Sequence, residues 1–291
     1  MKRKPPPAPT LISNELAWFG YPLLLWLMFF MAAPLFLVIA LGFFSRGEYG
    51  GVEAQLTLEN FHRLFDPVYF TIFVRSITLS LVTALICLAL SYPMAWAMAS
   101  ASQKWRLYFT VGLAIPFMTN LIIRVYAIKL CVGMDGPLQS LLTWLHISFD
   151  PYQISQNQTL VFYGMITSYL PFMVFPIYAA LEKFDFSLVE AAEDLGASQL
   201  KVLFSVILPN TRTAAVNSFT LVFVPCLGEF VIPDLLGGAK TMLAGNLITE
   251  QFLKARDWPF GAALSLGLMT VLLVLPYLLR RIFIPKAKAA A

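Results

Sequence analysis

The chain has 291 residues, of which 59% are hydrophobic and only 12% are charged, against about 25% charged residues in a soluble domain. A soluble core of this length cannot bury so much apolar surface, whereas a lipid bilayer can cover it. The net charge of +4 is too small for a nucleic-acid-binding surface, and the three cysteines have no C-x-x-C spacing that would favour a metal site.

The first apolar segment, residues 18–44, follows a basic and proline-rich tail of residues 1–17. This segment is roughly twice as long as the apolar part of a signal peptide, and no clear cleavage site follows it. We therefore expect a first membrane span that is retained in the mature protein.

Five further stretches are long and apolar enough to cross a bilayer, which takes about 20 residues. The six expected spans are residues 18–44, 70–100, 107–131, 159–181, 211–233 and 260–283. No sustained alternation of period two indicates a barrel. The sequence thus predicts an all-α integral membrane protein, with a six-helix transmembrane domain at 18–283 and a C-terminal tail at 284–291.

The basic residues indicate how the chain is oriented. If both tails are cytoplasmic, the inner segments carry 12 of the 20 Lys and Arg residues and the outer segments carry 7. Inner loops of membrane proteins are enriched in Lys and Arg. We therefore expect a multi-pass protein of a bacterial cell membrane with both termini in the cytoplasm.

The inner loop at about 182–210 has the strongest local signals. Ser187 and Glu190 have the spacing of a capping box, which predicts a helix start. Gly196 is placed to end that short helix, and Ser198 to cap a second one. We expect the second helix to stop before Pro209 and the acidic pair of helices to dock into a partner's groove.

The spacing of this loop resembles the coupling loop of ABC importer permeases, which reads Glu-Ala-Ala, three residues, Gly, nine residues, an aliphatic residue, any residue and Leu-Pro. The matching residues are Glu190, Ala191, Ala192, Gly196, Val206, Leu208 and Pro209. Val206 stands where isoleucine is commoner. An ordinary amphipathic surface loop would explain the capping signals but not the whole spacing.

The resemblance implies a type I ABC importer permease fold. It also implies that the loop sits in a cleft of a separate cytoplasmic ATPase subunit, where Glu190 meets basic residues. ATP would be bound by a dimer of that ATPase. This chain would then carry no cofactor of its own.

A second likeness is to the spermidine/putrescine permeases, specifically the first of their two permease subunits. It extends from about residue 55 onward, and the residues that carry it are Pro116, Phe117, Asn120, Arg124, Tyr126, Leu170–Met173, Pro225–Gly238, Gly245–Ile248, Gln251, Phe252 and Arg256–Ala263. The likeness implies a second permease subunit and a periplasmic polyamine-binding protein as partners, besides membrane lipid. No nucleic-acid partner is implied.

Two opposite charges are expected at a similar depth in the bilayer. At about 1.5 Å per residue, Glu229 would lie roughly 27 Å and Arg124 roughly 26 Å from the cytoplasmic edge of their spans. A lone charge inside a membrane is costly, so it pairs or faces water. We expect Arg124 and Glu229 to approach each other or to share a polar cavity.

The same residues suggest a substrate pathway. Glu229 and Asp234 would form an anionic lining for an amine dication, and Tyr126 and Phe230 would add aromatic faces for cation–π contacts, together with Phe223 and Tyr169. The alternative is a structural ion pair near the outer gate that never contacts substrate. The sequence leaves both interpretations open.

Three other functions compete with a polyamine importer. The chain could be a permease for another small solute, such as ferric ion, an opine or an amino-acid-like compound. It could be a secondary transporter driven by an ion gradient, although only Glu229 offers a membrane-embedded acidic residue. A membrane enzyme is the third, but no H-E-x-x-H or G-x-S-x-G pattern occurs, so we expect no catalytic residue and no metal ligand.

Overall fold

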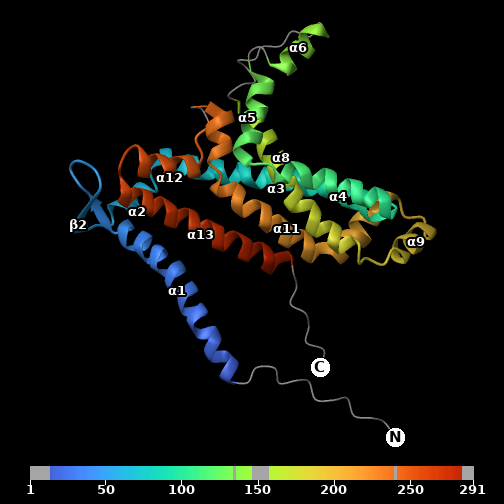
Figure 1. The fold of residues 1–291 in the computed structure, drawn as a ribbon, viewed down its shortest axis with the longest axis horizontal. Coiled ribbons are helices and arrows are strands. Elements are labelled where there is room, and N and C mark those ends of the chain that lie inside the picture. The colour runs from blue at the N-terminus through green and yellow to red at the C-terminus, as the bar shows by residue number, and fades with distance from the viewer. Residues whose placement is uncertain (1–13, 134–135, 146–156, 239–240, 284–291) are drawn as a thin grey trace.

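The structure is a computed structural model that describes residues 14–133, 136–145, 157–238 and 241–283. Its helices are α1 (Asn14–Gly42), α2 (Glu59–Arg63), α3 (Pro67–Ser100), α4 (Gln103–Met118), α5 (Leu121–Val132), α6 (Pro137–Trp144), α8 (Gln158–Leu181), α9 (Ser187–Asp194), α10 (Gln199–Val202), α11 (Leu208–Gly228), α12 (Ala244–Leu253) and α13 (Trp258–Phe283). Two π-helical segments, η1 (Leu203–Ile207) and η2 (Pro233–Gly237), and a hairpin of β1 (Phe44–Arg46) and β2 (Val52–Leu56) complete it. The hairpin and α9 lie at opposite ends of the long axis (Figure 1).

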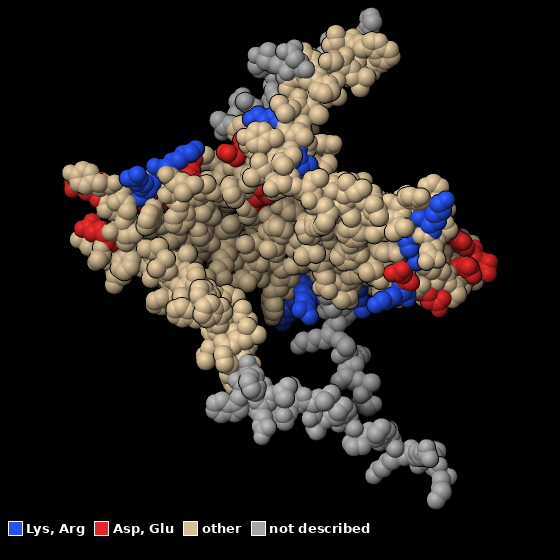
Figure 2. All heavy atoms as spheres, viewed as in Figure 1, with Lys and Arg blue, Asp and Glu red and all other residues tan. Residues whose placement is uncertain are grey.

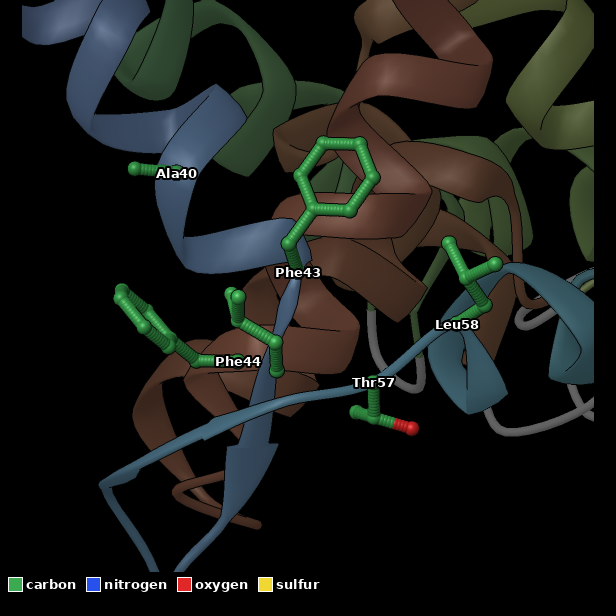
Figure 3. A pocket seen from close by; sticks show the side chains of 6 residues that line it. Ala40, Phe43, Phe44, Thr57 and Leu58 are labelled. Carbon is green, nitrogen blue, oxygen red and sulfur yellow. The ribbon is translucent and has the colours of Figure 1, made fainter.

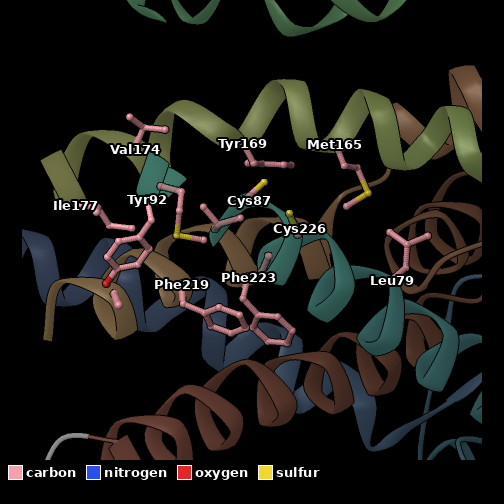
Figure 4. Packing of buried hydrophobic residues seen from close by; sticks show 14 of the residues in the cluster. Leu79, Cys87, Tyr92, Met165, Tyr169, Val174, Ile177, Phe219, Phe223 and Cys226 are labelled. Atoms are coloured by element: carbon pink, nitrogen blue, oxygen red, sulfur yellow. The ribbon is translucent and has the colours of Figure 1, made fainter. Parts of the chain in front are cut away.

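The core lies where α3, α8 and α11 pack against one another. Figure 4 shows its buried side chains, with Cys87 from α3, Met165 from α8 and Phe223 and Cys226 from α11, all fully buried. In the most apolar 18-residue stretch of α8, 56% of the residues are buried, which is the largest share among the long apolar helices. The packing of α3, α8 and α11 therefore holds the two ends of the bundle in fixed positions relative to each other.

Helix α1 lies at the periphery. Its main contacts are with α13, and none of its most apolar window is buried. In Figure 1 it diverges from the bundle toward its N-terminal end. Because α1 is apolar all round, its exposed surface suits a lipid or another membrane helix rather than water.

Four of the six expected spans are confirmed as helices long and apolar enough to cross a membrane: Gly20–Gly42, Pro67–Ser100, Gln158–Leu181 and Trp258–Phe283. The expected span at 211–233 forms α11, but this helix ends at Gly228. Over its described residues it is less apolar than the four helices that could cross a membrane. Its first turns carry Asn210, Thr211 and Arg212, which lower its hydropathy.

The expected span at 107–131 is broken instead of continuous. The chain bends by 91° between α4 and the helical segment that begins at Leu121. The two parts count as a fifth span only if they cross the membrane together. Local hydrogen bonds explain the break. The Thr119 hydroxyl donates to the Pro116 carbonyl at 2.6 Å, and the Asn120 side chain accepts the Ile122 N–H at 2.8 Å, which caps a new helix.

The tails expected at 1–17 and 284–291 lie outside the described residues, apart from positions 14–17 at the start of α1. Their cytoplasmic location stays a prediction.

The end of the molecule that carries the hairpin is held by a buried carboxylate that the sequence analysis did not single out. Asp257 is only 1% exposed, and it accepts a hydrogen bond from Arg63 at 2.9 Å, with Arg46 at 3.9 Å. The Arg63 guanidinium also lies 3.8 Å above the Phe260 ring. These contacts fasten α2 and the hairpin to the start of α13.

Beside the hairpin lies a mostly apolar hollow of about 760 Å³. Figure 3 looks into it and shows Phe43 and Phe44 from the end of α1 and the start of β1, with Thr57 and Leu58 opposite. It has no charged lining residue among those described, so it offers no recognition group for an ion.

Candidate functional site

Helix α9 begins at Ser187, as the sequence predicts, but the capping group differs from the expected one. The Ser187 N–H donates to the Asp185 carboxylate at 3.1 Å, so the capping acceptor is Asp185 rather than Ser187. Hydrogen bonds from Ser187 hold the pKa of the Asp185 carboxyl below its usual range.

Helix α9 ends as predicted at a glycine. Gly196 has φ +79°, a left-handed conformation that costs glycine little. Its N–H donates to the Glu193 carbonyl at 2.8 Å, and the Ala197 N–H donates to the Ala192 carbonyl at 3.0 Å. This pair of bonds is a Schellman motif, so the turn between the two short helices is fixed by the glycine.

The second helix begins after Ser198, as expected, although Ser198 makes no side-chain capping bond to a described residue. The prediction that this helix stops before Pro209 is wrong. The chain continues through α10 and the π-turn η1 into α11, and Pro209 lies in the first turn of α11. A proline normally loses the bond to residue i−4 and clashes there. Here η1 widens the helix before it, with the Leu208 N–H donating to the Leu203 carbonyl.

The outer surface of this loop is exposed, acidic and partly apolar. Glu190, Ala191, Glu193 and Asp194 are all exposed, and Leu195 is 89% exposed. Figure 2 shows the acidic side chains gathered at the α9 end of the molecule. Glu190 takes part in no ion pair with a described residue. We call residues Ser187–Leu200 the acidic knob.

The acidic knob is attached to the bundle through a few buried contacts. Val189 points into the core and is 7% exposed. Phe186 packs edge-on against Trp96 of α3, with 5.3 Å between ring centroids. Next to the knob, Glu182 pairs with Arg106 at 2.9 Å. One face of the knob is thus held, while the face with Glu190 is free to contact a partner.

The second region lies at the other end of α11, where the helix ends at Gly228 and Glu229 is extended. Glu229 is 7% exposed. One carboxylate oxygen accepts the N–H groups of Val231 at 2.9 Å and Ile232 at 3.3 Å, and the other accepts the Tyr169 hydroxyl at 2.5 Å. Glu229 therefore caps the helical turn that leads into η2 and ties it to α8. We call this region the Glu229 break.

Helix α12 packs closely against the backbone of the Glu229 break. A Cβ added to Gly245 would lie 2.7 Å from the Gly228 carbonyl oxygen and 2.9 Å from that of Glu229. The Asn246 amide donates to the Phe230 carbonyl at 2.8 Å. The absence of a side chain at Gly245 is therefore required for this approach.

The expected pairing of Arg124 with Glu229 is not found. Among the described residues, ion pairs join Arg46 and Arg63 to Asp257 and Arg106 to Glu182. Arg124 donates instead to the Thr119 carbonyl at 3.2 Å. Arg124 and Glu229 would lie at the same depth only if residues 107–131 formed one straight helix, and the chain bends before Asn120.

Three of the remaining candidates for a substrate pathway are accessible, whereas the expected aromatic face of Phe223 is wrong, because its ring is fully buried in the core. Asp234 is exposed, Phe230 is 45% exposed and Tyr126 is 47% exposed. Segment η2, which contains Asp234, contacts both α5 and α8. The structure thus brings Glu229 together with Tyr169, whereas Asp234 keeps its carboxylate at the surface.

The chemistry of the described residues includes no metal centre. No group of three or more His, Cys, Asp or Glu side chains is arranged to hold a metal ion within this part of the chain.

Two structural contacts near the candidate site escaped the sequence analysis. The capping role of Asp185 could have been found, because an Asp two residues before a helix start is a common capping pattern. The buried hydrogen bond between the Tyr92 and Thr211 hydroxyls, at 2.8 Å, joins α3 to α11 across 119 positions, and no local signal points to it.

Comparisons with known proteins give a consistent result. The family model described as "Binding-protein-dependent transport system inner membrane component" matches residues 93–289, more than half of the chain. The spermidine/putrescine transport system permease protein PotB of Escherichia coli (strain K12) is 41% identical over 85% of this chain and 90% of its own length. PotB of Haemophilus influenzae is 40% identical over 86% of this chain and 87% of its own length.

A more distant relative is the inner membrane ABC transporter permease protein YdcU of Escherichia coli (strain K12), which is 28% identical over 92% of this chain and 86% of its own. Among solved structures, a chain of the bacterial alginate ABC transporter in complex with alginate pentasaccharide-bound periplasmic protein superposes with a TM-score of 0.72. It covers 92% of this chain and 93% of its own, at 16% identity. That likeness shows a shared fold.

Proposed function

The chain belongs to the family of binding-protein-dependent transport system inner membrane components, and we propose on that premise that it is the permease subunit of an ATP-driven polyamine importer. The observation that carries the proposal is the acidic knob, an exposed acidic helix pair at one end of a largely apolar bundle. The likeness to spermidine/putrescine permeases over 85% of the chain supports the substrate class.

The acidic knob is the surface through which the permease would couple to a separate ATPase dimer. Glu190 is exposed and without an ionic partner among the described residues, so a basic residue of the ATPase could pair with it. Ala191 and Ala192 allow a close approach, and the turn at Gly196 fixes the shape of the knob. Leu208 and Pro209 begin α11, directly after η1, which connects this helix to the knob.

The partners follow from this role. A second permease subunit would complete the pathway, and a soluble polyamine-binding protein would deliver the substrate from the side of the hairpin. With the acidic knob in the cytoplasm, both termini would also be cytoplasmic. The apolar surface of α1 would face lipid or the second permease.

Within the pathway, we assign different tasks to the carboxylates. Asp234 has an exposed carboxylate, and Phe230 and Tyr126 have exposed rings that suit cation–π contacts with an amine. Glu229 uses both oxygens for internal hydrogen bonds, so it would shape the gate rather than bind the polyamine. Arg124 would mark the break between α4 and α5.

The test is ATP hydrolysis by the complete importer reconstituted in lipid, with its ATPase, second permease and binding protein. Polyamine-loaded binding protein should stimulate hydrolysis, and the stimulation should be lost in Glu190→Arg. The variant Lys104→Glu reverses the charge of an exposed residue at the start of α4, outside both the acidic knob and the hairpin, and should respond like the wild type.

The outcomes separate the competing functions. Stimulation by the binding protein without any effect of spermidine or putrescine would leave an importer for another solute. Uptake that follows an imposed ion gradient and needs no ATPase would contradict the proposal and favour a secondary transporter.

A further inference from the structure

An apolar groove of about 400 Å³ lies between α3, α11 and α13, and none of its lining residues belongs to the acidic knob or the Glu229 break. Its walls are aliphatic and aromatic, with Leu81 and Leu85 from α3, Ala215 and Phe219 from α11 and Leu279 from α13. The only charged lining residue among those described is Arg212. A groove of this composition suits a hydrocarbon chain that ends near a cation.

Positive charge gathers at one end of the groove. Arg280 and Arg281 lie in the last turn of α13, between the lining residues Leu279 and Phe283. Arg212, Arg280 and Arg281 are all exposed, and none takes part in an ion pair with a described residue. Figure 2 shows basic side chains on the lower edge of the view, where α13 ends in Figure 1.

The arginines lie at the depth of lipid headgroups. Helix α13 begins at Trp258, a residue type that favours the membrane interface. The rise of about 1.5 Å per residue places Arg280 roughly 33 Å further along the axis, close to the hydrocarbon thickness of about 30 Å. The spacing of Trp258 and Arg280 therefore matches the thickness of a bilayer, and with Arg280 at one border the groove would run from the headgroups into the hydrocarbon region.

We propose that this groove binds one anionic phospholipid, with an acyl chain against α3, α11 and α13 and its phosphate at Arg212, Arg280 and Arg281. Arginine suits this task because its planar guanidinium binds phosphate oxygens in pairs. Basic pockets between membrane helices commonly recognise anionic headgroups. Charge complementarity selects a lipid over a helix of a second permease, because an apolar helix would leave three arginines without an anion.

The experiment uses the complete importer purified in detergent and measured by native mass spectrometry. Dioleoyl phosphatidylglycerol and dioleoyl phosphatidylcholine, which share their acyl chains, are titrated separately. We expect phosphatidylglycerol to be retained in preference. Each Arg→Gln change at the three positions should weaken its binding about fivefold, and the triple variant on the order of 100-fold.

Two further variants distinguish the contribution of the headgroup charge from that of the apolar groove to lipid binding. Lys104→Gln removes an exposed positive charge at the start of α4, away from the groove, and should leave binding unchanged. Ala215→Phe keeps every charge but fills the wall of the groove, and should weaken phosphatidylglycerol binding. Inorganic phosphate at millimolar concentration should not displace the lipid, since it has no chain to fill the groove.

Three results would overturn the proposal. They are equal retention of the two lipids, undiminished phosphatidylglycerol binding in the triple arginine variant, and efficient cross-linking of Leu279→Cys to the second permease in a complex that retains no lipid. The last result would identify the groove as a contact between permease subunits.

Discussion

The acidic knob and the Glu229 break lie at the two ends of α11, and each contains a glutamate that the sequence marks as functional. Glu190 is exposed and has no ionic partner among the described residues, whereas Glu229 is 7% exposed and accepts three hydrogen bonds. The first carboxylate is available to another molecule. The second is used by the fold.

The difference shows that a charge in a membrane protein has to be judged by its hydrogen-bond partners. A buried carboxylate can be satisfied by backbone N–H groups and a hydroxyl without any cation. Substitution should therefore affect assembly at one glutamate and stability at the other, and four predictions test this contrast.

The largest effect is expected at Glu190. Reversing its charge in Glu190→Arg places like charges together at the ATPase contact, which costs several kcal/mol. Uptake should fall by more than about 100-fold, while the unfolding temperature of the isolated permease stays the same. Uptake by proteoliposomes and a thermal melt measure the two quantities. A lower melting temperature in this variant would show that Glu190 also stabilises the fold, which would contradict the assigned difference between Glu190 and Glu229.

The opposite behaviour is expected at Glu229. Glu229→Ala leaves the Val231 and Ile232 N–H groups and the Tyr169 hydroxyl without an acceptor, and should lower the free energy of unfolding by about 3 kcal/mol. Tyr169→Phe removes one of these bonds and should cost about 1 kcal/mol. Thermal unfolding in detergent checks both. If Glu229→Ala were as stable as the wild type, the carboxylate would not be a structural cap.

Two glycines at the Glu229 break provide a matched pair. A Cβ at Gly245 would lie 2.7 Å from the Gly228 carbonyl oxygen, whereas a Cβ at Gly228 would meet no described atom within 4 Å. Gly245→Ala should therefore destabilise the protein by about 1–3 kcal/mol, and Gly228→Ala should leave it within about 0.5 kcal/mol. Equal effects of the two changes in the same melting experiment would show that α12 does not pack here.

The smallest effect is expected at the cap of α9. Asp185→Asn keeps an acceptor for the Ser187 N–H but loses the charge, so α9 should exchange its amide hydrogens slightly faster. Because the folded pKa of Asp185 lies below its usual range, its contribution is complete above the unfolded pKa and is lost as the pH falls through the folded pKa. Hydrogen exchange of α9 in the wild type should follow that acid transition, and the variant should not.

Local patterns were sufficient for much of the fold. Apolar runs predicted α1, α3, α8 and α13, because lipid requires long uninterrupted helices. The start of α9 and its end at Gly196 also followed from short-range rules for capping and for left-handed glycine.

The features that sequence reasoning missed depend on contacts between distant residues, or on a local competition between a continuing helix and a bend or π-turn. The bend before Asn120 is formed by side-chain hydrogen bonds that compete with a continuing helix. The partners of Glu229 come from Tyr169, 60 positions away, and no periodicity reveals such a pair. The continuation past Pro209 depended on a π-turn, for which the sequence has no simple signature.

The path from Gln199 through η1 to Gly228 contains no interruption, and its 30 residues span roughly 45 Å at about 1.5 Å per residue. A hydrogen-bonded rod of this kind resists changes in its length, so a displacement applied at one end reaches the other end nearly undiminished. The π-turn at Leu203–Ile207, where one turn holds an extra residue, is the softest point for twisting. The chain from Gln199 to Gly228 can therefore pass a displacement from one end of the molecule to the other, and its angle can be adjusted at η1 beside Pro209 and at Pro225, where the proline has no backbone N–H.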